Sequence, residues 1–369
     1  MKHIIFIISF ILFGISSNSQ TLNSWTNFRG NQQLTGVSEA KMPDNPKLIW
    51  TYTTDDNIKS SPVISNNKII VGSTDGFVYC LDLKGDLLWK FNTENSIEAS
   101  PLILGNMVYV GNLDGRLFAI NMENGEEAWQ YKCDNQISGS PNWWKEGDVT
   151  NIFVGSYDYY LHCVDAKTGN LRWKYETDNF VNGAAACNNG KAVFGGCDGF
   201  LHIVDINSGE LSAKIDVATY IASSAALEGN YAYFGDYDGR FSQVDMEAKK
   251  ITWSWGQENV HLPFIASPAL FGEKIVIGNN DKFVYCYNKN SGNLEWKYNT
   301  GKKIDASAII AGNKVLVGNA RGDLLILGLE KGDLLWSYEL GSPIVSNPAI
   351  VKGKIVVGAF DGTIYCFGN

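Results

Sequence analysis

Positive charge is scarce in this sequence. Lysine and arginine number 30 against 39 aspartates and glutamates, so the formal net charge is -9 and the isoelectric point lies near 5.0. A protein that binds nucleic acid presents a basic stripe to the phosphates, and no such stripe occurs here. We therefore exclude nucleic acid as a partner, and anionic membrane surfaces are disfavoured for the same reason.

Long apolar runs are missing after the first residues. The opening MKHIIFIISFILFGISSNSQ has a basic Lys2, an apolar run from Ile4 to Ile15 and small residues at Ser17 and Ser19, which is typical of a secretory signal peptide. Its apolar run is shorter than the roughly 20 residues of a membrane-spanning helix. We predict cleavage after Ser19, export to the periplasm or the medium, and a mature chain without a transmembrane segment. No cysteine lies between residues 1 and 71 to accept a lipid, so no lipid anchor is expected.

Helical periodicity is absent beyond the signal peptide, and an internal repeat takes its place. The repeat is clearest in VGSTDGFVYCLDLKGDLLW (71–89), VGNLDGRLFAINMENGEEAW (110–129) and VGSYDYYLHCVDAKTGNLRW (154–173). Its runs, such as KIIVG and FVYCLD, are rich in β-branched and aromatic residues and end at Asp-Gly or Asn-Gly pairs, a pattern that predicts strand, turn, strand. A period of about forty residues with strands in each unit indicates four-stranded propeller blades and not a helical array.

One glycine anchors each unit and allows the units to be counted. These glycines follow one another at intervals of 39 to 44 residues and are Gly72, Gly111, Gly155, Gly195, Gly235, Gly278, Gly318 and Gly358. The eighth unit stops at Phe367, before the strand that carries a tryptophan elsewhere, and a spare strand of that type, LIWTY at residues 48–52, precedes the first unit. We predict an all-β, eight-bladed propeller of four-stranded blades whose ring is closed by the N-terminal strand. Residues 1–19 then form the signal peptide, residues 20–47 a leader, and residues 48–369 the propeller.

Most residues that resemble a site are explained by the repeat. Each Asp-Gly pair, such as Asp75-Gly76, is expected at a hairpin tip, and calcium is disfavoured because one aspartate per blade is dispersed around the ring. One large aromatic residue per blade is expected to pack between blades. These structural tryptophans are Trp50, Trp89, Trp129, Trp173, Trp253, Trp296 and Trp336, with Ala213 in the fourth blade.

The cysteines and two histidines also occupy repeat positions. Cys80, Cys163, Cys286 and Cys366 share one position, so they are expected to be small core residues too far apart for disulfides. The pairing of Cys133, Cys187 and Cys197 stays open. His162 and His202 share a position with Tyr79, Phe118, Tyr285 and Tyr365. We expect these two histidines to pack in the core or between blades, since no carboxylate or cysteine close in sequence favours zinc.

One position of the innermost strand changes its chemistry from blade to blade. It lies between an apolar and a small residue, and its members are Lys59, Glu98, Ser138, Asn182, Ala222, Ile265, Asp305 and Val345. Strand alternation places it opposite the small residue, and we expect it to face the central channel or its mouth. Lys59, Glu98, Asn182 and Asp305 are therefore candidates for a partner or ligand surface. The alternative for the first two is that they pair across neighbouring blades.

A second candidate surface lies in the 44-residue interval. Its segment Asn142-Trp143-Trp144-Lys145-Glu146 carries two tryptophans outside the repeat, and we expect an extended loop there. Trp143 and Trp144 would suit a protein partner. Packing of this loop against the body is the alternative.

The order of Gly, Asp, Asp-x-x-Thr-Gly and Trp in residues 154–173 resembles the tryptophan-docking repeat of the PQQ-type β-propellers. The resemblance covers nearly the whole mature chain, and it is specific for the fold more than for function. The leader NSWTNFRGNQQLTGVSEA, with Trp25, Phe28, Arg29 and Gly30, also resembles the segment before the propeller in PQQ-binding-like proteins. We expect it to lie across the outside or the base of the propeller.

Two branches of this family imply different functions. The quinoprotein alcohol dehydrogenases hold PQQ and calcium in the propeller axis and use an adjacent cysteine pair, whereas this sequence has neither adjacent cysteines nor a Cys-x-x-Cys-His haem segment. The BamB-type outer-membrane assembly factors have no enzymatic site and act through a partner protein. Length, blade number and export signal agree with this branch, although the lipidation cysteine of that class is missing.

The resemblance therefore implies a non-catalytic, monomeric scaffold without a cofactor, which contacts a protein partner in the cell envelope. One alternative is a dehydrogenase that depends on PQQ and calcium. The other is a propeller that recognises a glycan or peptide at the channel mouth.

Overall fold

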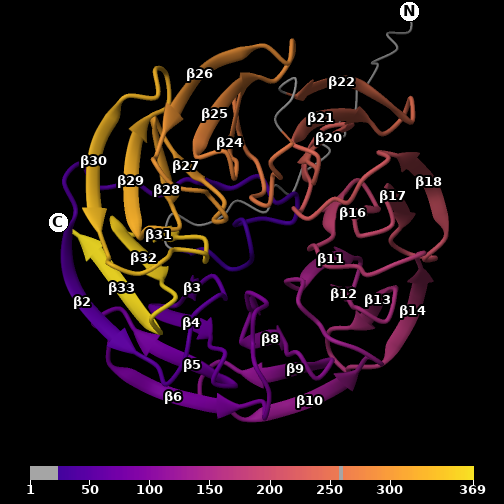
Figure 1. The fold of residues 1–369 in the computed structure, drawn as a ribbon. Coiled ribbons are helices and arrows are strands. Elements are labelled where there is room, and N and C mark those ends of the chain that lie inside the picture. Colours follow the sequence, from indigo (N-terminus) through magenta and orange to yellow (C-terminus); the bar gives the residue numbers. More distant parts are fainter. Residues whose placement is uncertain (1–23, 257–260) are drawn as a thin grey trace, which may run out of the picture.

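The computed structural model describes residues 24–256 and 261–369, which form eight β-sheets around a central axis (Figure 1). The predicted signal peptide lies outside the described residues. Each sheet contains a blade of four antiparallel strands, with the first strand nearest the axis and the fourth at the rim, and one sheet gains a fifth strand from the leader. The prediction of an eight-bladed, all-β propeller is confirmed.

The first four blades follow the chain in order. Blade 1 contains β3 (Val63–Ser65), β4 (Lys68–Gly72), β5 (Phe77–Asp82) and β6 (Leu87–Asn92). Blade 2 contains β7 (Leu102–Leu104), β8 (Met107–Gly111), β9 (Arg116–Asn121) and β10 (Glu127–Lys132). Blade 3 contains β11 (Asn142–Glu146), β12 (Val149–Gly155), β13 (Tyr160–Asp165) and β14 (Leu171–Glu176). Blade 4 contains β15 (Ala186–Asn188), β16 (Lys191–Gly195), β17 (Phe200–Asp205) and β18 (Leu211–Asp216).

The last four blades complete the ring. Blade 5 contains β19 (Ala226–Glu228), β20 (Tyr231–Gly235), β21 (Arg240–Asp245) and β22 (Lys250–Gly256). Blade 6 contains β23 (Ala269–Phe271), β24 (Lys274–Gly278), β25 (Phe283–Asn288) and β26 (Leu294–Asn299). Blade 7 contains β27 (Ile309–Ala311), β28 (Lys314–Gly318), β29 (Asp323–Gly328) and β30 (Leu334–Glu339), and β1 (Val37–Ser38) joins it in parallel. Blade 8 contains β31 (Ala349–Val351), β32 (Lys354–Gly358), β33 (Thr363–Gly368) and β2 (Lys47–Thr53).

The two ends of the chain meet in blade 8. Strand β2 pairs antiparallel with β33, so that Leu48 lies opposite Phe367 and Thr51 opposite Tyr365. The N-terminal strand therefore supplies the fourth strand of the last blade, as the sequence predicts, and leaves no open edge between blade 8 and blade 1.

Burial follows the distance of each strand from the axis. The second and third strands are covered by neighbouring blades on both faces, and KIIVG and FVYCLD of blade 1 each contain four successive buried residues. The fourth strand alternates between exposed and half-buried residues, which places Trp89 of LLWKFN on its packed face. Apolar side chains thus fill the spaces between blades.

The repeated tryptophans form the outer contacts between blades. The indole Nε1 of Trp173 donates a hydrogen bond of 2.9 Å to the carbonyl of Ile206 in the next blade. Its ring lies against Gly209, where an added Cβ would stand 2.6 Å from the indole Cδ2 and where φ is +73°. Trp50, Trp89, Trp129 and Trp296 make the same two contacts. Trp336 instead packs edge-on against Phe367, because blade 8 has no turn between its third and fourth strands.

Trp253 is the exception among these tryptophans, and comparison with it can measure how much the indole hydrogen bond contributes to stability. Its ring packs against Gly292, but its buried Nε1 has no hydrogen-bond partner among the described residues. The equivalent acceptor, the carbonyl of Lys289, receives a hydrogen bond from the amide of Gln243. Blade 5 therefore keeps the packing of the tryptophan and lacks its polar contact.

We predict that Trp173→Phe lowers the free energy of unfolding by about 1 kcal/mol more than Trp253→Phe. Both substitutions keep an aromatic ring against glycine, but the first also leaves the Ile206 carbonyl without its donor. Equilibrium urea unfolding of the two variants measures the difference. Equal losses would contradict the assignment of this hydrogen bond as stabilising.

The anchoring glycines form the inner contacts between blades. A Cβ added at Gly278 would lie 2.3 Å from Cγ2 of Ile304, a buried apolar residue in the segment that leads into β27 of the next blade. The same approach recurs at every anchoring glycine, and at Gly358 it meets Ile58, which completes the circle. Glycine is needed here because the blades touch at backbone distance.

The segment with two extra tryptophans is a strand and not a loop, so that expectation is wrong. The four-residue insertion lengthens a hairpin, and β11 pairs with β12 with Trp143 opposite Ile152 and Trp144 opposite Asn151. Alternation then sends the two rings to opposite faces: Trp143 packs in the cluster with Trp129, and Trp144 packs in the cluster with Trp173. The pair does not form one surface for a partner.

The leader follows one face of the ring from blade 1 to blade 8. Backbone N–H groups at equivalent positions of the blades donate to leader carbonyls, as Ile64 does to Trp25 and Ile310 does to Gly36. The other donors are Ile103, Cys187, Leu227 and Leu270. At the end of the path the hydroxyl of Ser38 donates to the carbonyl of Ile350. The leader is thus bonded to successive blades across this face.

Candidate functional site: the central channel and its mouth

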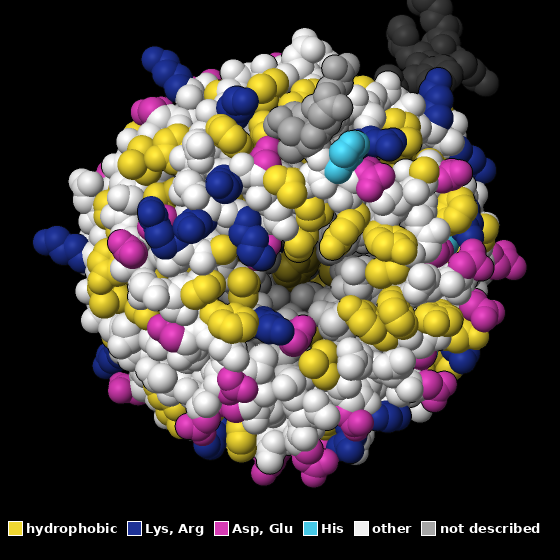
Figure 2. All heavy atoms as spheres, in the orientation of Figure 1, with side chains coloured by type: hydrophobic (Ala, Val, Ile, Leu, Met, Phe, Trp, Pro, Cys, Tyr) yellow, Lys and Arg dark blue, Asp and Glu magenta, His cyan; other side chains and the backbone are white. Residues whose placement is uncertain are grey.

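The variable position lines a pocket on the axis, as expected, but it does not lie within the innermost strand. In blade 1 that strand begins at Val63, so Lys59 belongs to the segment that leads into it. The volume of the pocket is about 170 Å³, and its walls include Lys59, Ser61, Glu98, Ser100, Ser138, Asn182, Ala222, Ile265, Asp305 and Val345. All four polar candidates named from the sequence lie in this wall. Figure 2 shows the hollow at the centre of the ring.

The charged candidates are paired. Lys59 Nζ lies 2.6 Å from Glu98 Oε1 across blades 1 and 2, with about a third of each side chain exposed. Asp305 forms an ion pair of 2.8 Å with Lys303 of its own blade. The structure therefore confirms the alternative in which Lys59 and Glu98 pair across neighbouring blades. With Asp305 also paired, the channel wall carries little free charge.

Two neutral polar groups of the wall are unpaired. The Oγ of Ser138 and the Oδ1 of Asn182 are buried, and neither has a hydrogen-bond partner within the part of the chain that the structure describes. They belong to neighbouring blades 3 and 4. A buried polar atom is costly unless it is hydrogen-bonded, so this side of the pocket is suited to a polar guest or water.

Polar side chains one residue after the small position, mostly serines, form a ring around the axis that is interrupted at Ala184, and sequence reasoning missed it. The backbone N–H of Ser61 donates to Oγ of Ser100 in the next blade at 3.0 Å, and the same bond joins Ser100 to Ser140. It recurs from Ala184 through Ser224, Ser267, Ser307 and Asn347 back to Ser61. The repeat carries a signal for it in the recurring Ser-Pro pairs at 61–62, 100–101, 140–141 and 267–268.

The leader closes one end of the channel. Phe28 lines the axial pocket, and the next residue, Arg29, is buried with 1% of its surface exposed. Its guanidinium donates to the carbonyls of Ala308 at 2.7 Å and Pro268 at 2.9 Å. Burial lowers the pKa of Arg29 to about 9, so the side chain stays charged at neutral pH. The leader therefore lies against one end of the axial pocket.

Aromatic side chains gather at the open mouth over blades 3 to 5. Tyr157 and Phe180 stack with ring centroids 4.5 Å apart, and Tyr159 packs against Phe180. Tyr220 and Tyr237 contact each other edge-on and are each about half exposed. We refer to these five residues as the aromatic arc. Figure 2 shows hydrophobic side chains beside the central hollow on this side of the ring.

The residues of the aromatic arc lie in loops that each blade presents at the channel mouth. Tyr157 and Tyr237 occupy the turn after the second strand of their blades, and the N–H of Tyr237 donates to the carbonyl of Tyr220. Blade 1 has Asn57 and Thr74 at the equivalent positions, joined by the same backbone bond. Sequence reasoning missed the arc because its members are scattered in sequence, although aromatic residues at these turn positions are visible in the repeat.

The turn aspartates act within the blades, as the repeat suggests. Asp75 accepts the N–H of Phe77 and the hydroxyl of Tyr79, which lies four residues later. Asp361 and Tyr365 repeat this contact. In blades 3 and 4 a histidine replaces the tyrosine, and His202 Nε2 lies 2.8 Å from Asp198. All seven cysteines are unpaired, which also settles the open pairing of Cys133, Cys187 and Cys197.

Eight four-stranded blades, docked by repeated tryptophans and closed by the N-terminal strand, define a PQQ-type β-propeller. The sequence profile of the family described as "Outer membrane protein assembly factor BamB" matches residues 36–142 and 197–369. The chain belongs to this family. No curated protein matches it significantly in sequence.

Solved structures of similar fold include proteins of both branches. BamB from Moraxella catarrhalis has a TM-score of 0.74 and 18% identity over 88% of this chain and 98% of its own. A europium-containing methanol dehydrogenase has a TM-score of 0.79 and 12% identity over 95% and 99%. The quinohemoprotein alcohol dehydrogenase from Comamonas testosteroni has a TM-score of 0.79 and 14% identity over 94% and 80%. At these identities the likeness concerns the fold.

Proposed function

We propose that this protein is a non-catalytic scaffold in the cell envelope that binds a protein partner and takes part in outer-membrane protein assembly, as the name of its family indicates. The observation that carries the proposal is the aromatic arc. Exposed tyrosines grouped on one side of the mouth provide the large, rigid contact area that dominates the energy of protein interfaces. Family membership and the predicted signal peptide support location in the envelope. Among the described residues, no helix has the length and apolar character to cross a membrane.

The lining of the channel does not fit PQQ, which supports a non-catalytic role. PQQ is a planar anion with three carboxylates, and the pocket offers it one cation, Lys59, which already pairs with Glu98. Asp305 adds a further negative charge to the wall. A calcium ion needs several oxygens converged on one point, but Glu98 and Asp305 stand on blades 2 and 7 with their own lysine partners. We propose that the protein works without either group.

The proposal is tested by crosslinking in the native envelope. We expect Tyr220→Ala with Tyr237→Ala to reduce recovery of an outer-membrane assembly protein by at least about 10-fold, because two central aromatic anchors are removed. The control is Tyr231→Ala, which removes an exposed tyrosine from the opposite end of the same blade.

The control should leave recovery unchanged. Two results would contradict the proposal: equal recovery with the double variant and the parent protein, or recovery only of partners unrelated to outer-membrane assembly. Dye reduction with an alcohol after addition of PQQ and calcium would favour the dehydrogenase alternative instead.

A further inference from the structure

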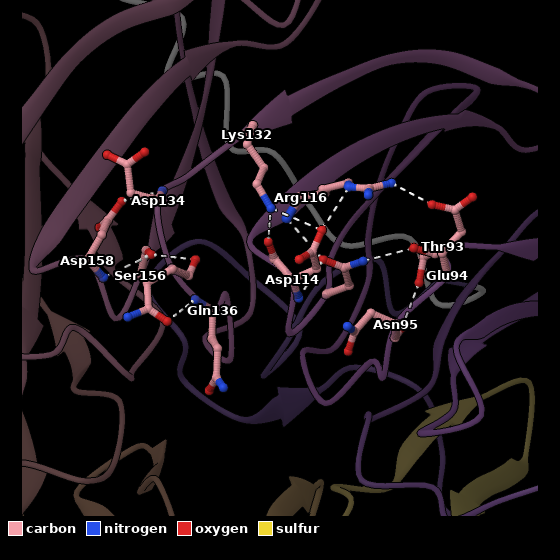
Figure 3. A network of polar contacts seen from close by, with 12 residues as sticks. Thr93, Glu94, Asn95, Asp114, Arg116, Lys132, Asp134, Gln136, Ser156 and Asp158 are labelled. Carbon is pink, nitrogen blue, oxygen red and sulfur yellow. Dashed lines mark hydrogen bonds and ion pairs between the residues drawn. The ribbon is translucent and has the colours of Figure 1, made fainter.

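Three different metal-ligating groups meet between blades 2 and 3. Cys133 follows β10, Asp158 lies in the turn between β12 and β13, and His162 lies on β13; their Sγ, carboxylate and imidazole atoms lie within 4.8 Å of one another. The side chains of Asp158 and His162 are 7% and 3% exposed, and Cys133 is buried. Figure 3 shows Asp158 and Ser156 beside Asp134, which follows Cys133 in the connection after β10. The sequence argument that neither a carboxylate nor a cysteine supports His162 is therefore wrong.

The repeat shows that the fold does not require the thiol. Threonine occupies the position of Cys133 at residues 54, 93, 177 and 300, and each of these hydroxyls bonds two backbone carbonyls. In blade 3 the carbonyl of Asn135 is bonded instead by the hydroxyl of Ser156, at 3.0 Å. Cys133 therefore lacks the hydrogen bonds to backbone carbonyls that the four threonines make. Its sulfur instead lies beside a carboxylate and an imidazole.

The imidazole and the carboxylate are held in place by their neighbours. His162 Nδ1 lies 2.9 Å from the hydroxyl of Tyr131, and its Nε2 lies 3.1 and 3.0 Å from the two oxygens of Asp158. Asp158 also accepts the N–H groups of Asp134 and Tyr160. A histidine that binds a metal through one nitrogen is typically oriented by a hydrogen bond on the other, which is the role open to Tyr131.

The charges of the two anionic ligands suit a divalent cation. A divalent ion bound to the thiolate and the carboxylate would form a neutral set, which favours a buried position.

We propose that Cys133, Asp158 and His162 bind a zinc ion between blades 2 and 3, with water as the fourth ligand. On binding, the thiol releases its proton to solvent. The imidazole stays neutral, its proton moves from Nε2 to Nδ1, and this Nδ1–H then donates a hydrogen bond to the hydroxyl oxygen of Tyr131. Ligand atoms on one tetrahedral zinc lie about 3.3 to 3.8 Å apart, so atoms that lie within 4.8 Å of one another need shifts of no more than about 1 Å. Zinc binding at this site does not depend on the proposed function, although Asp158 lies between Tyr157 and Tyr159 of the aromatic arc.

Blade 4 supplies a matched comparison within the same chain. His202 and Asp198 repeat the contact of His162 and Asp158, and Tyr175 bonds His202 Nδ1 at 3.1 Å. Thr177 stands in place of the cysteine. The same geometry without sulfur should not bind zinc tightly, and Thr177→Cys should create a second site.

The experiment uses the reduced, full mature chain loaded with Zn²⁺ or with Co²⁺ as a spectroscopic probe. We expect one equivalent of zinc and a thiolate-to-cobalt charge-transfer band. Cys133→Thr and His162→Tyr, which install residues found in other blades, should abolish the band and weaken zinc binding more than 100-fold, beyond the 10–100-fold typical of losing an outer partner. Thr177→Cys should raise the stoichiometry to two.

Two further variants test whether loss of zinc binding is specific to the three proposed ligands. Tyr131→Phe should weaken zinc binding by about 10- to 100-fold while the charge-transfer band remains, because it removes only the positioning residue. Cys197→Ser, at the half-buried cysteine of blade 4, should change nothing. Zinc binding that survives Cys133→Thr, a cobalt spectrum without a thiolate band, or an unchanged stoichiometry in Thr177→Cys would each overturn the proposal.

Discussion

Gly278→Ala is expected to lower the free energy of unfolding by about 3 kcal/mol, the upper end of the usual cost of overpacking. The added methyl would stand 2.3 Å from Cγ2 and 2.9 Å from Cβ of Ile304, and both residues are fully packed. The nearest atoms are Cβ of Ile304, which is bonded to the backbone, and Cγ2, which is bonded to that Cβ. Rotation of the flexible end of the side chain therefore cannot relieve the contact. Blades 6 and 7 would have to separate, and closure of the ring opposes that movement.

A double-mutant cycle distinguishes this clash from a general effect of alanine. Ile304→Ala alone should cost about 2 to 5 kcal/mol through the cavity it leaves. The double variant should cost less than the sum by about 1 to 3 kcal/mol, because each change makes room for the other. Equilibrium urea unfolding measures all three variants.

Gly272→Ala is the control in the same blade. Its added methyl meets nothing within 4 Å, and its φ of +59° accounts for a cost of about 1 to 2 kcal/mol. Strictly additive losses at Gly278 and Ile304, or a Gly278→Ala cost no greater than that of Gly272→Ala, would show that close approach of the blades does not explain the anchoring glycine.

Features that recur in the sequence could be predicted, because eight copies reveal which residue types the fold tolerates at each position. The strands, the ring closure and the packing of Trp173 between blades follow from this recurrence. So does the placement of Lys59 in the channel wall, where the copies disagree. The anchoring glycine was recognised by its recurrence, but its reason, contact with Ile304 of the next blade, appears only when the blades are placed side by side.

Features that occur once could not be predicted in the same way. Arg29 has no counterpart in the blades, and its role depends on the carbonyls of Ala308 and Pro268, which lie more than 200 residues away. The site at Cys133 depends on the end of one blade meeting a turn of the next. The contact of His162 with Asp158 could have been predicted from the sequence, because an aspartate four residues before an aromatic residue or histidine is a recurring pattern.

We expect the chain not to fold without β2, the strand that closes the ring. A chain of residues 54–369 lacks β2, and with it the partner of β33 and the indole of Trp50 that bonds the carbonyl of Leu83. The third strand of blade 8 would then be an open edge with apolar residues exposed beside it. We expect a loss of more than about 5 kcal/mol, comparable to the whole stability of a small domain, and therefore no folded monomer.

Two further chains isolate the strand from the leader. Residues 47–369 keep β2 without the leader. Residues 54–369 followed by the turn sequence DAKTG of blade 3 and then KLIWTYT supply the same strand from the other end, as a hairpin of the usual blade type. Both should give folded monomers by size-exclusion chromatography and thermal melting, because the ring needs the fourth strand and not its origin. If residues 54–369 alone melted like residues 47–369, closure by β2 would not be what holds the ring together.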